Sequence, residues 1–195
     1  MNPLRTLLTT GLATLLVVGL GACGQDDPTD ETTSAQPSPS TSLEDTVTTV
    51  FDRYWKQANT ANPAEPPSAE LKALLTDEAY ADATKSAKTF PEITVKGKDE
   101  IVASKATAAS DTEASVEVCY EVHRRLVVKK TYRAQGGTVA AGTDIRTDQN
   151  GRPIEDGAEM VNLVTFERES ASDSWQVSSN QVGYKSSCDL EKAAR

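Results

Sequence analysis

Few side chains in this sequence could perform covalent or acid–base chemistry: a single histidine, His123, and three cysteines, Cys23, Cys119 and Cys188. Cys119 and His123 fall on one side of a predicted strand, where a thiol could pair with an imidazole. Four residues of extended chain place their backbones roughly 13 Å apart, beyond hydrogen-bond reach. We therefore expect no cysteine nucleophile, and we interpret His123 as an exposed strand residue.

Metal and phosphate sites receive no support from the motifs. One histidine leaves mainly carboxylates as metal ligands. A calcium loop aligned on Gly151 would place Arg146 and Gly157 at positions that require acids. The pair Gly136-Gly137 lacks the lysine that follows in a phosphate-binding loop. We predict neither a metal nor a cofactor.

The charge balance argues against nucleic acid as a partner. The chain of 195 residues carries 20 basic and 29 acidic side chains, for a formal net charge of -9, whereas phosphate binding requires a basic face. Neighbouring residues on a strand point to opposite faces, so we interpret the one basic cluster as a solvated strand edge. Its members are Arg124, Arg125, Lys129, Lys130 and Arg133.

Residues 1–22 have the layout of a secretory signal, with one early Arg5 and an apolar stretch interrupted by Thr and Gly. The sequence Leu20-Gly21-Ala22-Cys23 resembles the lipobox of bacterial lipoproteins. The resemblance implies that Cys23 is lipidated, becomes the first mature residue and anchors the protein to the outer face of the bacterial cytoplasmic membrane. The alternative is an ordinary secretory signal with an incidental cysteine.

The segment 23–42 is acidic, rich in Ser, Thr and Pro, and almost free of apolar side chains. Such a segment buries too little surface to offset its conformational entropy, so we predict a disordered tether. Its residues could reach on the order of 60 Å in a polyproline II conformation. The folded domain is expected over residues 43–195.

Helical periodicity dominates the first third of that domain. Apolar residues from Leu43 to Ala58 recur at spacings of three and four. A capping box could start this helix, with Thr41 paired to Glu44 or Ser42 paired to Asp45, and Asn62-Pro63 is expected to end it. Further helical segments are predicted from Ser68 to Phe90, in one or two pieces.

The period changes from 3.6 to 2 after Pro91, which predicts strands. The predicted strands include Ile93 to Val95, Ile101 to Ala106, Val116 to His123, Leu126 to Tyr132, Met160 to Glu167 and Trp175 to Val182. Residues 134–159 are expected to hold a hairpin that turns at Asn150-Gly151. Helices first and strands afterwards predict an α+β fold, with N-terminal helices packed on a curved, mostly antiparallel sheet.

This order resembles the nuclear transport factor 2-like superfamily, which includes SnoaL-like and ketosteroid-isomerase-like proteins. The resemblance lies in VTTVFDRYWKQA, LKALLTDEAYADA and VNLVTFERESASDSWQVSS. It implies a cone in which a curved sheet wraps the first helix, often with a pocket between them. Tyr54, Trp55 and Tyr120 are the candidate pocket residues, although aromatics at such spacings often form core.

The cysteines divide into one anchor and one pair. With Cys23 assigned to lipid, Cys119 and Cys188 remain in an exported chain, where disulfides persist. We therefore predict a disulfide, against the alternative of two free thiols. Similar anchored domains with cysteine pairs near these places occur among lipoproteins of high-GC Gram-positive bacteria.

Three functions remain open at the level of sequence. The leading hypothesis is a non-enzymatic, lipid-anchored extracytoplasmic module that binds an envelope protein or a small hydrophobic ligand. One alternative is a SnoaL-like enzyme acting on a hydrophobic small molecule inside the cone, although no catalytic residue can be named. The other is a structural component of an envelope complex.

Overall fold

The computed structural model describes residues 42–134, 136–148, 150–185 and 187–190. These residues belong to one compact unit, Pro39–Arg195. The predicted signal segment, the lipidation site Cys23 and nearly all of the predicted tether lie outside the described residues. The helices are α1 (Leu43–Ala58), α2 (Ala69–Lys72) and α3 (Asp77–Ala87), and the strands are β1 (Ile93–Lys96), β2 (Glu100–Ala108), β3 (Glu113–Val122), β4 (Arg125–Val128), β5 (Tyr132–Ala134), β6 (Gly137–Val139), β7 (Ala158–Glu167) and β8 (Gln176–Lys185).

Helix α1 begins at a capping box and ends earlier than the sequence predicts. Ser42 accepts a hydrogen bond from the N–H of Asp45, whose carboxylate accepts one from the N–H of Ser42, so the second of the two predicted pairs forms. The helix ends at Ala58 rather than at Asn62-Pro63. The physical reason is Asn59, whose side-chain amide bonds both the N–H and the carbonyl of Asp99.

The region from Ser68 to Phe90 forms two separate helices. Ser68 caps the short α2, and Thr76 caps α3. Between them the chain is tied to β8, because Val177 donates its N–H to Leu74 and Thr76 donates its N–H to Val177. This interruption places the leucines of the linking turn in the core beneath α1.

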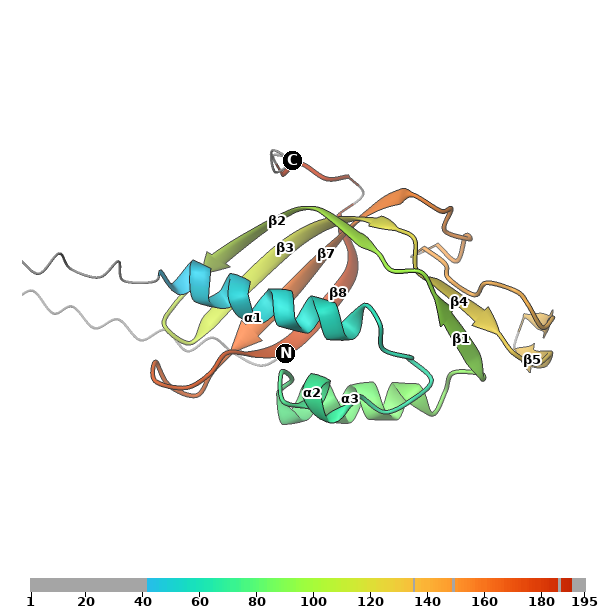
Figure 1. Cartoon of the computed structure of the whole chain (residues 1–195), viewed down its shortest axis with the longest axis horizontal. Coiled ribbons are helices and arrows are strands. Elements are labelled where there is room, and N and C mark those ends of the chain that lie inside the picture. The colour runs from blue at the N-terminus through green and yellow to red at the C-terminus, as the bar shows by residue number, and fades with distance from the viewer. Residues whose placement is uncertain (1–41, 135, 149, 186, 191–195) are drawn as a thin grey trace, which may run out of the picture. The chain divides into compact units, whose positions relative to one another are not determined.

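A four-stranded antiparallel sheet with the order β2-β3-β7-β8 carries α1 on its inner face, and the sheet curves around the helix (Figure 1). The core forms between them from Val47 and Phe51 of α1 and from sheet residues such as Val118 and Phe166, all at most 1% exposed. Burial of this apolar stripe is the main stabilising term of the fold. The predicted α+β class is confirmed.

Beyond one end of the four-stranded sheet, the chain forms two small antiparallel pairs, β1-β4 and β5-β6 (Figure 1). The predicted turn at Asn150-Gly151 exists, but its hairpin is reduced to a single bridge between Thr147 and Pro153. Residues 142–145 run against β4, where Val128 donates its N–H to Thr143 and Ile145 donates its N–H to Leu126. Val127 forms an isolated bridge with Asp144 there.

The outer face of the sheet is covered by the C-terminal segment. Cys119 and Cys188 form a disulfide, which confirms the predicted pair. Cys119 belongs to a small apolar cluster with Ala103 and Val161, against which Leu190 also packs. Lys185 reinforces this arrangement, because it pairs with Glu117 of β3 and with Asp189 of the C-terminal segment.

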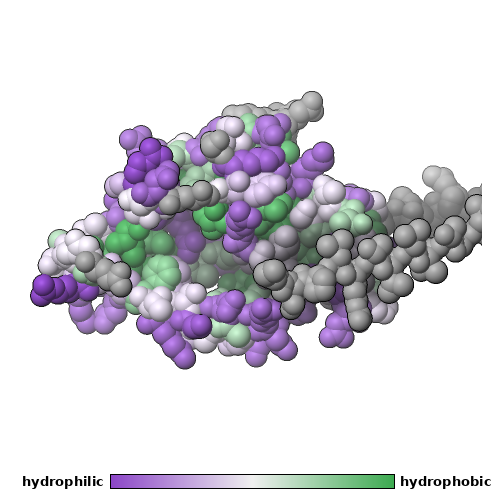
Figure 2. All heavy atoms as spheres, turned by 180° about the vertical axis from the view of Figure 1, so that it is seen from behind, coloured by the Kyte–Doolittle hydropathy of each residue, from purple (hydrophilic) through white to green (hydrophobic). Residues whose placement is uncertain are grey.

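No helix within the described ranges is long and apolar enough to cross a membrane. Figure 2 shows the face opposite to that of Figure 1. Hydrophobic side chains gather there in and beside a hollow, and hydrophilic side chains cover most of the surroundings.

Candidate functional site

A cavity of about 360 Å³ opens beside the C-terminal end of α1. Its walls come from α1, the inner face of the sheet and the loop that follows β6. Most of the lining is apolar, which is typical of a small-molecule site. The lining residues are Trp55, Ala58, Asn59, Phe90, Asp99, Tyr120, Val122, Arg124, Leu126, Ile145, Arg146, Thr147, Ile154, Met160, Asn162, Asn180 and Val182.

Two of the three candidate pocket residues lie in this wall. Trp55 and Tyr120 pack edge to face with ring centroids 5.0 Å apart. Tyr54 is buried beside them, where its hydroxyl accepts a hydrogen bond from the lining residue Asn180 at 3.2 Å, and burial raises its pKa. Phe90 and Val182, two of the exposed large apolar residues, also line the cavity.

The floor of the cavity holds a buried polar network. Tyr120 donates its hydroxyl to Oδ1 of Asn162 at 3.1 Å, and the N–H of Gly183 donates to the same oxygen at 3.2 Å. Asn162 is only 4% exposed, so these bonds satisfy an amide that would otherwise be costly to bury. Burial raises the pKa of Tyr120, and the nearby charge of Asp99 raises it further. Tyr120 is therefore a neutral hydrogen-bonding group at physiological pH.

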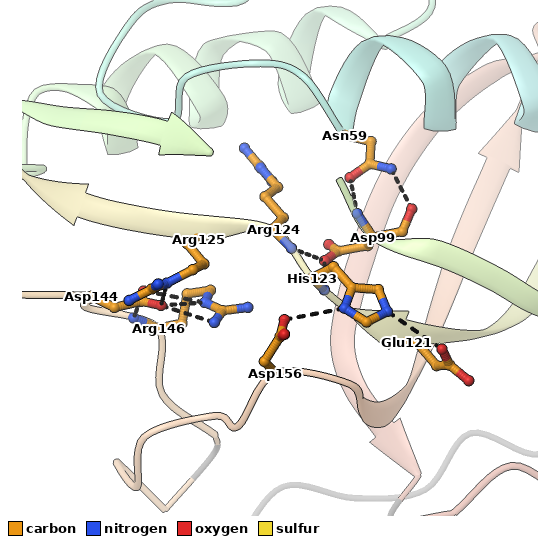
Figure 3. A network of polar contacts seen from close by, with 9 residues as sticks. All are labelled: Asn59, Asp99, Glu121, His123, Arg124, Arg125, Asp144, Arg146 and Asp156. Atoms are coloured by element: carbon orange, nitrogen blue, oxygen red, sulfur yellow. Dashed lines mark hydrogen bonds and ion pairs between the residues drawn. The ribbon is translucent and has the colours of Figure 1, made fainter. Parts of the chain in front are cut away.

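Asp99 anchors the turn at which the cavity wall changes from β3 to β4. Its Oδ1 accepts the backbone N–H groups of His123 at 3.0 Å and Arg124 at 2.8 Å (Figure 3). Gly97 lies two residues earlier with φ of 71°, close against the backbone of His123. Asn59, which ends α1, holds the backbone of Asp99 from the other side. These hydrogen bonds fix the end of α1, the turn at Asp99 and the end of β3 to one another.

Arg124 does not lie on a solvated strand edge, so the interpretation of the basic cluster was wrong for this residue. It precedes β4, is half-buried and lines the cavity. Its Nη2 donates to the carbonyl oxygen of Ala61, beyond the end of α1, and its buried Nε has no hydrogen-bond partner among the described residues. Burial lowers the pKa of this guanidinium.

Arg146 is the second guanidinium in the wall, and its side chain is only 9% exposed. Its Nε and Nη2 donate to Asp144 at distances between 2.8 and 3.2 Å, and Asp144 also accepts from Nε of Arg125 at 3.2 Å (Figure 3). Burial raises the pKa of Asp144, but these bonds outweigh it and the pKa lies below its usual value. The Nη1 group of Arg146 is buried and unpartnered within the described part of the chain.

His123 lies outside the cavity, among carboxylates. Its Nδ1 is 3.1 Å from Asp156 and its Nε2 is 3.4 Å from Glu121. His123, Glu121 and Glu100 form a group whose possible ligand atoms lie within 4.8 Å of one another. Such a group could supply metal ligands. Both ring nitrogens of His123 face carboxylates, so we interpret the group instead as hydrogen-bonded pairs that become ion pairs when His123 is protonated. The hydrogen bonds to Asp156 and Glu121 raise the pKa of His123.

A separate groove of about 640 Å³ runs beside the cavity and shares Ile154 and Met160 with it. Its walls carry charges of both signs, including Asp148, Arg152 and Lys185. Arg152 pairs with Asp148 at 2.7 Å. None of the buried unpartnered polar atoms of the described residues belongs to this groove, so it offers less specific chemistry than the cavity.

Sequence reasoning missed the polar half of the cavity. Asp99, Arg124, Arg146 and Asn162 are far apart in the chain and belong to no motif. The one signal available was Asn162, a polar residue on the apolar side of a predicted strand. No protein-family model matches the chain, and no significant match among curated proteins is found.

Proposed function

We propose that this protein is a lipid-anchored binding module on the outer face of the bacterial cytoplasmic membrane, which takes a small, largely apolar ligand into its cavity. The observation that carries the proposal is the lining of that cavity: an apolar wall, with Trp55 and Tyr120 in contact, around a few fixed polar groups. A volume of about 360 Å³ lies within the range of small-molecule sites.

Two features of the chain support the location and the fold type in this proposal. The leader that ends in Cys23 supports lipid anchoring, and the segment after it supports a tether that holds the domain away from lipid. The packing of α1 on the inner face of a curved antiparallel sheet supports membership of the nuclear transport factor 2-like superfamily. That resemblance implies a pocket between the sheet and the first helix.

An enzyme inside the cone is the second candidate, and Asp99 is the observation that favours it. Asp99 shares the cavity wall with Tyr120, as a base and a hydrogen-bond donor would in proton-transfer chemistry. However, Oδ1 of Asp99 is already engaged by two backbone N–H groups, and Tyr120 donates to Asn162. Both groups serve the architecture of the site, which favours binding over turnover.

The proposal can be tested with an uncharged probe, 4-iodophenylacetamide, whose iodine quenches tryptophan fluorescence on contact. Trp55 lines the cavity, whereas the other tryptophan, Trp175, is 2% exposed beneath the guanidinium of Arg168. We expect saturable quenching of the full-length protein in nanodiscs, and we expect the Trp55→Phe variant to lose it. Quenching that rises linearly with probe, or that persists in Trp55→Phe, would contradict a cavity site.

A further inference from the structure

Two buried donors in the cavity have no acceptor within the described part of the chain: Nε of Arg124 and Nη1 of Arg146. Burying an unpartnered donor costs about 1–3 kcal/mol, and more when the group is charged. Folded proteins therefore seldom retain two such groups in the wall of one cavity without a use for them. Both side chains line the same cavity.

The structure fixes the direction of each guanidinium. Asp144 holds the Nε–Nη2 edge of Arg146, so that Nη1 is left on the side away from this carboxylate. Arg124 is held at its Nη2 by Ala61, which leaves Nε within the wall. Burial is the main cause that lowers the pKa of Arg124, the charge of Asp99 opposes it, and the like charge of Arg146 adds to it. An anion bound between the two guanidiniums would relieve this repulsion.

The charged residues that line the cavity indicate the charge of that anion. Two guanidiniums, those of Arg124 and Arg146, line the cavity together with one carboxylate, that of Asp99. The excess is one positive charge, in a chain whose formal net charge is -9. One negative charge with two acceptor oxygens matches two donors on separate guanidiniums, and a carboxylate has this form.

From these observations we infer that the cavity binds an amphipathic monocarboxylate, with its carboxylate on Arg124 and Arg146 and its apolar body against Trp55 and Tyr120. This inference rests on the proposed binding function and adds the chemical class of the ligand. Arg146 fixes the orientation of the ligand, since its side chain is nine-tenths buried and already aligned by Asp144. Preorganisation of this kind limits the entropic cost of binding.

The test compares 4-iodophenylacetate with 4-iodophenylacetamide, two probes of similar shape that differ in charge. Dissociation constants are measured by tryptophan quenching of the full-length protein in nanodiscs. We expect the carboxylate to bind about tenfold more tightly than the amide, because it can accept one or two charge-assisted hydrogen bonds from the arginines. Arg146→Gln and, independently, Arg124→Gln should reduce carboxylate binding to the level of the amide.

Arg125→Gln is the matched control. Arg125 also contacts Asp144, but its side chain is 52% exposed and does not line the cavity, so this variant should keep the preference for the carboxylate. Equal binding of both probes to the wild type would overturn the inference while leaving the proposed function intact. Absence of saturable binding for either probe would overturn both. Should Arg146→Gln fail to fold, Arg124→Gln decides the outcome, since its guanidinium makes no bond to Asp144.

Discussion

At the scale of single residues, the cavity is distinguished by donors rather than by acids. Within the described part of the chain, the buried side-chain polar atoms of the cavity that lack partners belong to two arginines, whereas Tyr120 donates its hydroxyl to Asn162. His123, the single histidine of the sequence, is occupied by Asp156 and Glu121 outside the cavity. Under the proposed function, the two arginines of the cavity would recognise the ligand, and His123 would form a pH-sensitive pair outside it.

The pKa of His123 should lie above its usual value of 6.5, because hydrogen bonds to Asp156 and Glu121 favour the charged form. The stabilisation from this raised pKa is fully present below the unfolded pKa and is lost as pH rises through the folded pKa. Titration of the imidazole resonances by NMR measures the shift. The Asp156→Asn variant should lower the pKa towards 6.5, and an unchanged value would contradict the assignment.

At the scale of elements, periodicity predicted most helices and strands, but not how they end. The sequence pattern placed Val47, Phe51 and Tyr54 on the buried face of α1, where the structure has them. The end of α1 depends on Asn59, which donates a hydrogen bond to Asp99, forty residues away. The periodicity of apolar residues within one segment does not predict such a contact. For the same reason Arg146, in a segment predicted only as a hairpin, could not be assigned to the cavity from the sequence.

The turn at Gly97 is the element that fixes one wall of the cavity, and replacing Gly97 should disturb it. A Cβ at this position would overlap the carbonyl oxygen of His123, and the φ of 71° is itself unfavourable for other residues. We expect Gly97→Ala to lower the free energy of unfolding by about 3 kcal/mol, from backbone strain and overlap together. Chemical denaturation measures this change.

Gly142→Ala provides the comparison for Gly97→Ala. Gly142 also has a positive φ, of 87°, but a Cβ there would meet no atom of the described residues within 4 Å. Its substitution should therefore lower the free energy of unfolding by only about 1 kcal/mol, the cost of backbone strain alone. Equal losses in the two variants would show that the close approach to His123 does not matter.

At the scale of the whole molecule, the protein combines an expected membrane anchor with a domain whose C-terminal segment is fastened to the sheet. The disulfide between Cys119 and Cys188 holds that segment on the outer face, on the side of the sheet away from α1. The cavity lies on the inner side of the sheet, beside α1. Disulfide pairing is consistent with an exported protein.

Lipid attachment at Cys23 predicts how the whole protein partitions. The Cys23→Ala variant should leave the membrane fraction or remain unprocessed, because two acyl chains are sufficient for stable anchoring and the variant has none. Cell fractionation and intact-mass analysis measure this directly. Ser34→Ala, a substitution in the predicted tether, should behave as the wild type. A Cys23→Ala protein with unchanged mass and membrane partitioning would contradict the anchor.

The central claim, that the cavity beside α1 is a ligand site, is tested most directly by locating a bound probe. Crystals of residues 39–195 soaked with 4-iodophenylacetate would reveal the iodine through its anomalous scattering. We predict an iodine position within the cavity, against Trp55 and Tyr120, with the carboxylate towards Arg124 and Arg146. Iodine confined to the outer surface or to the neighbouring groove, with none in the cavity, would contradict the claim.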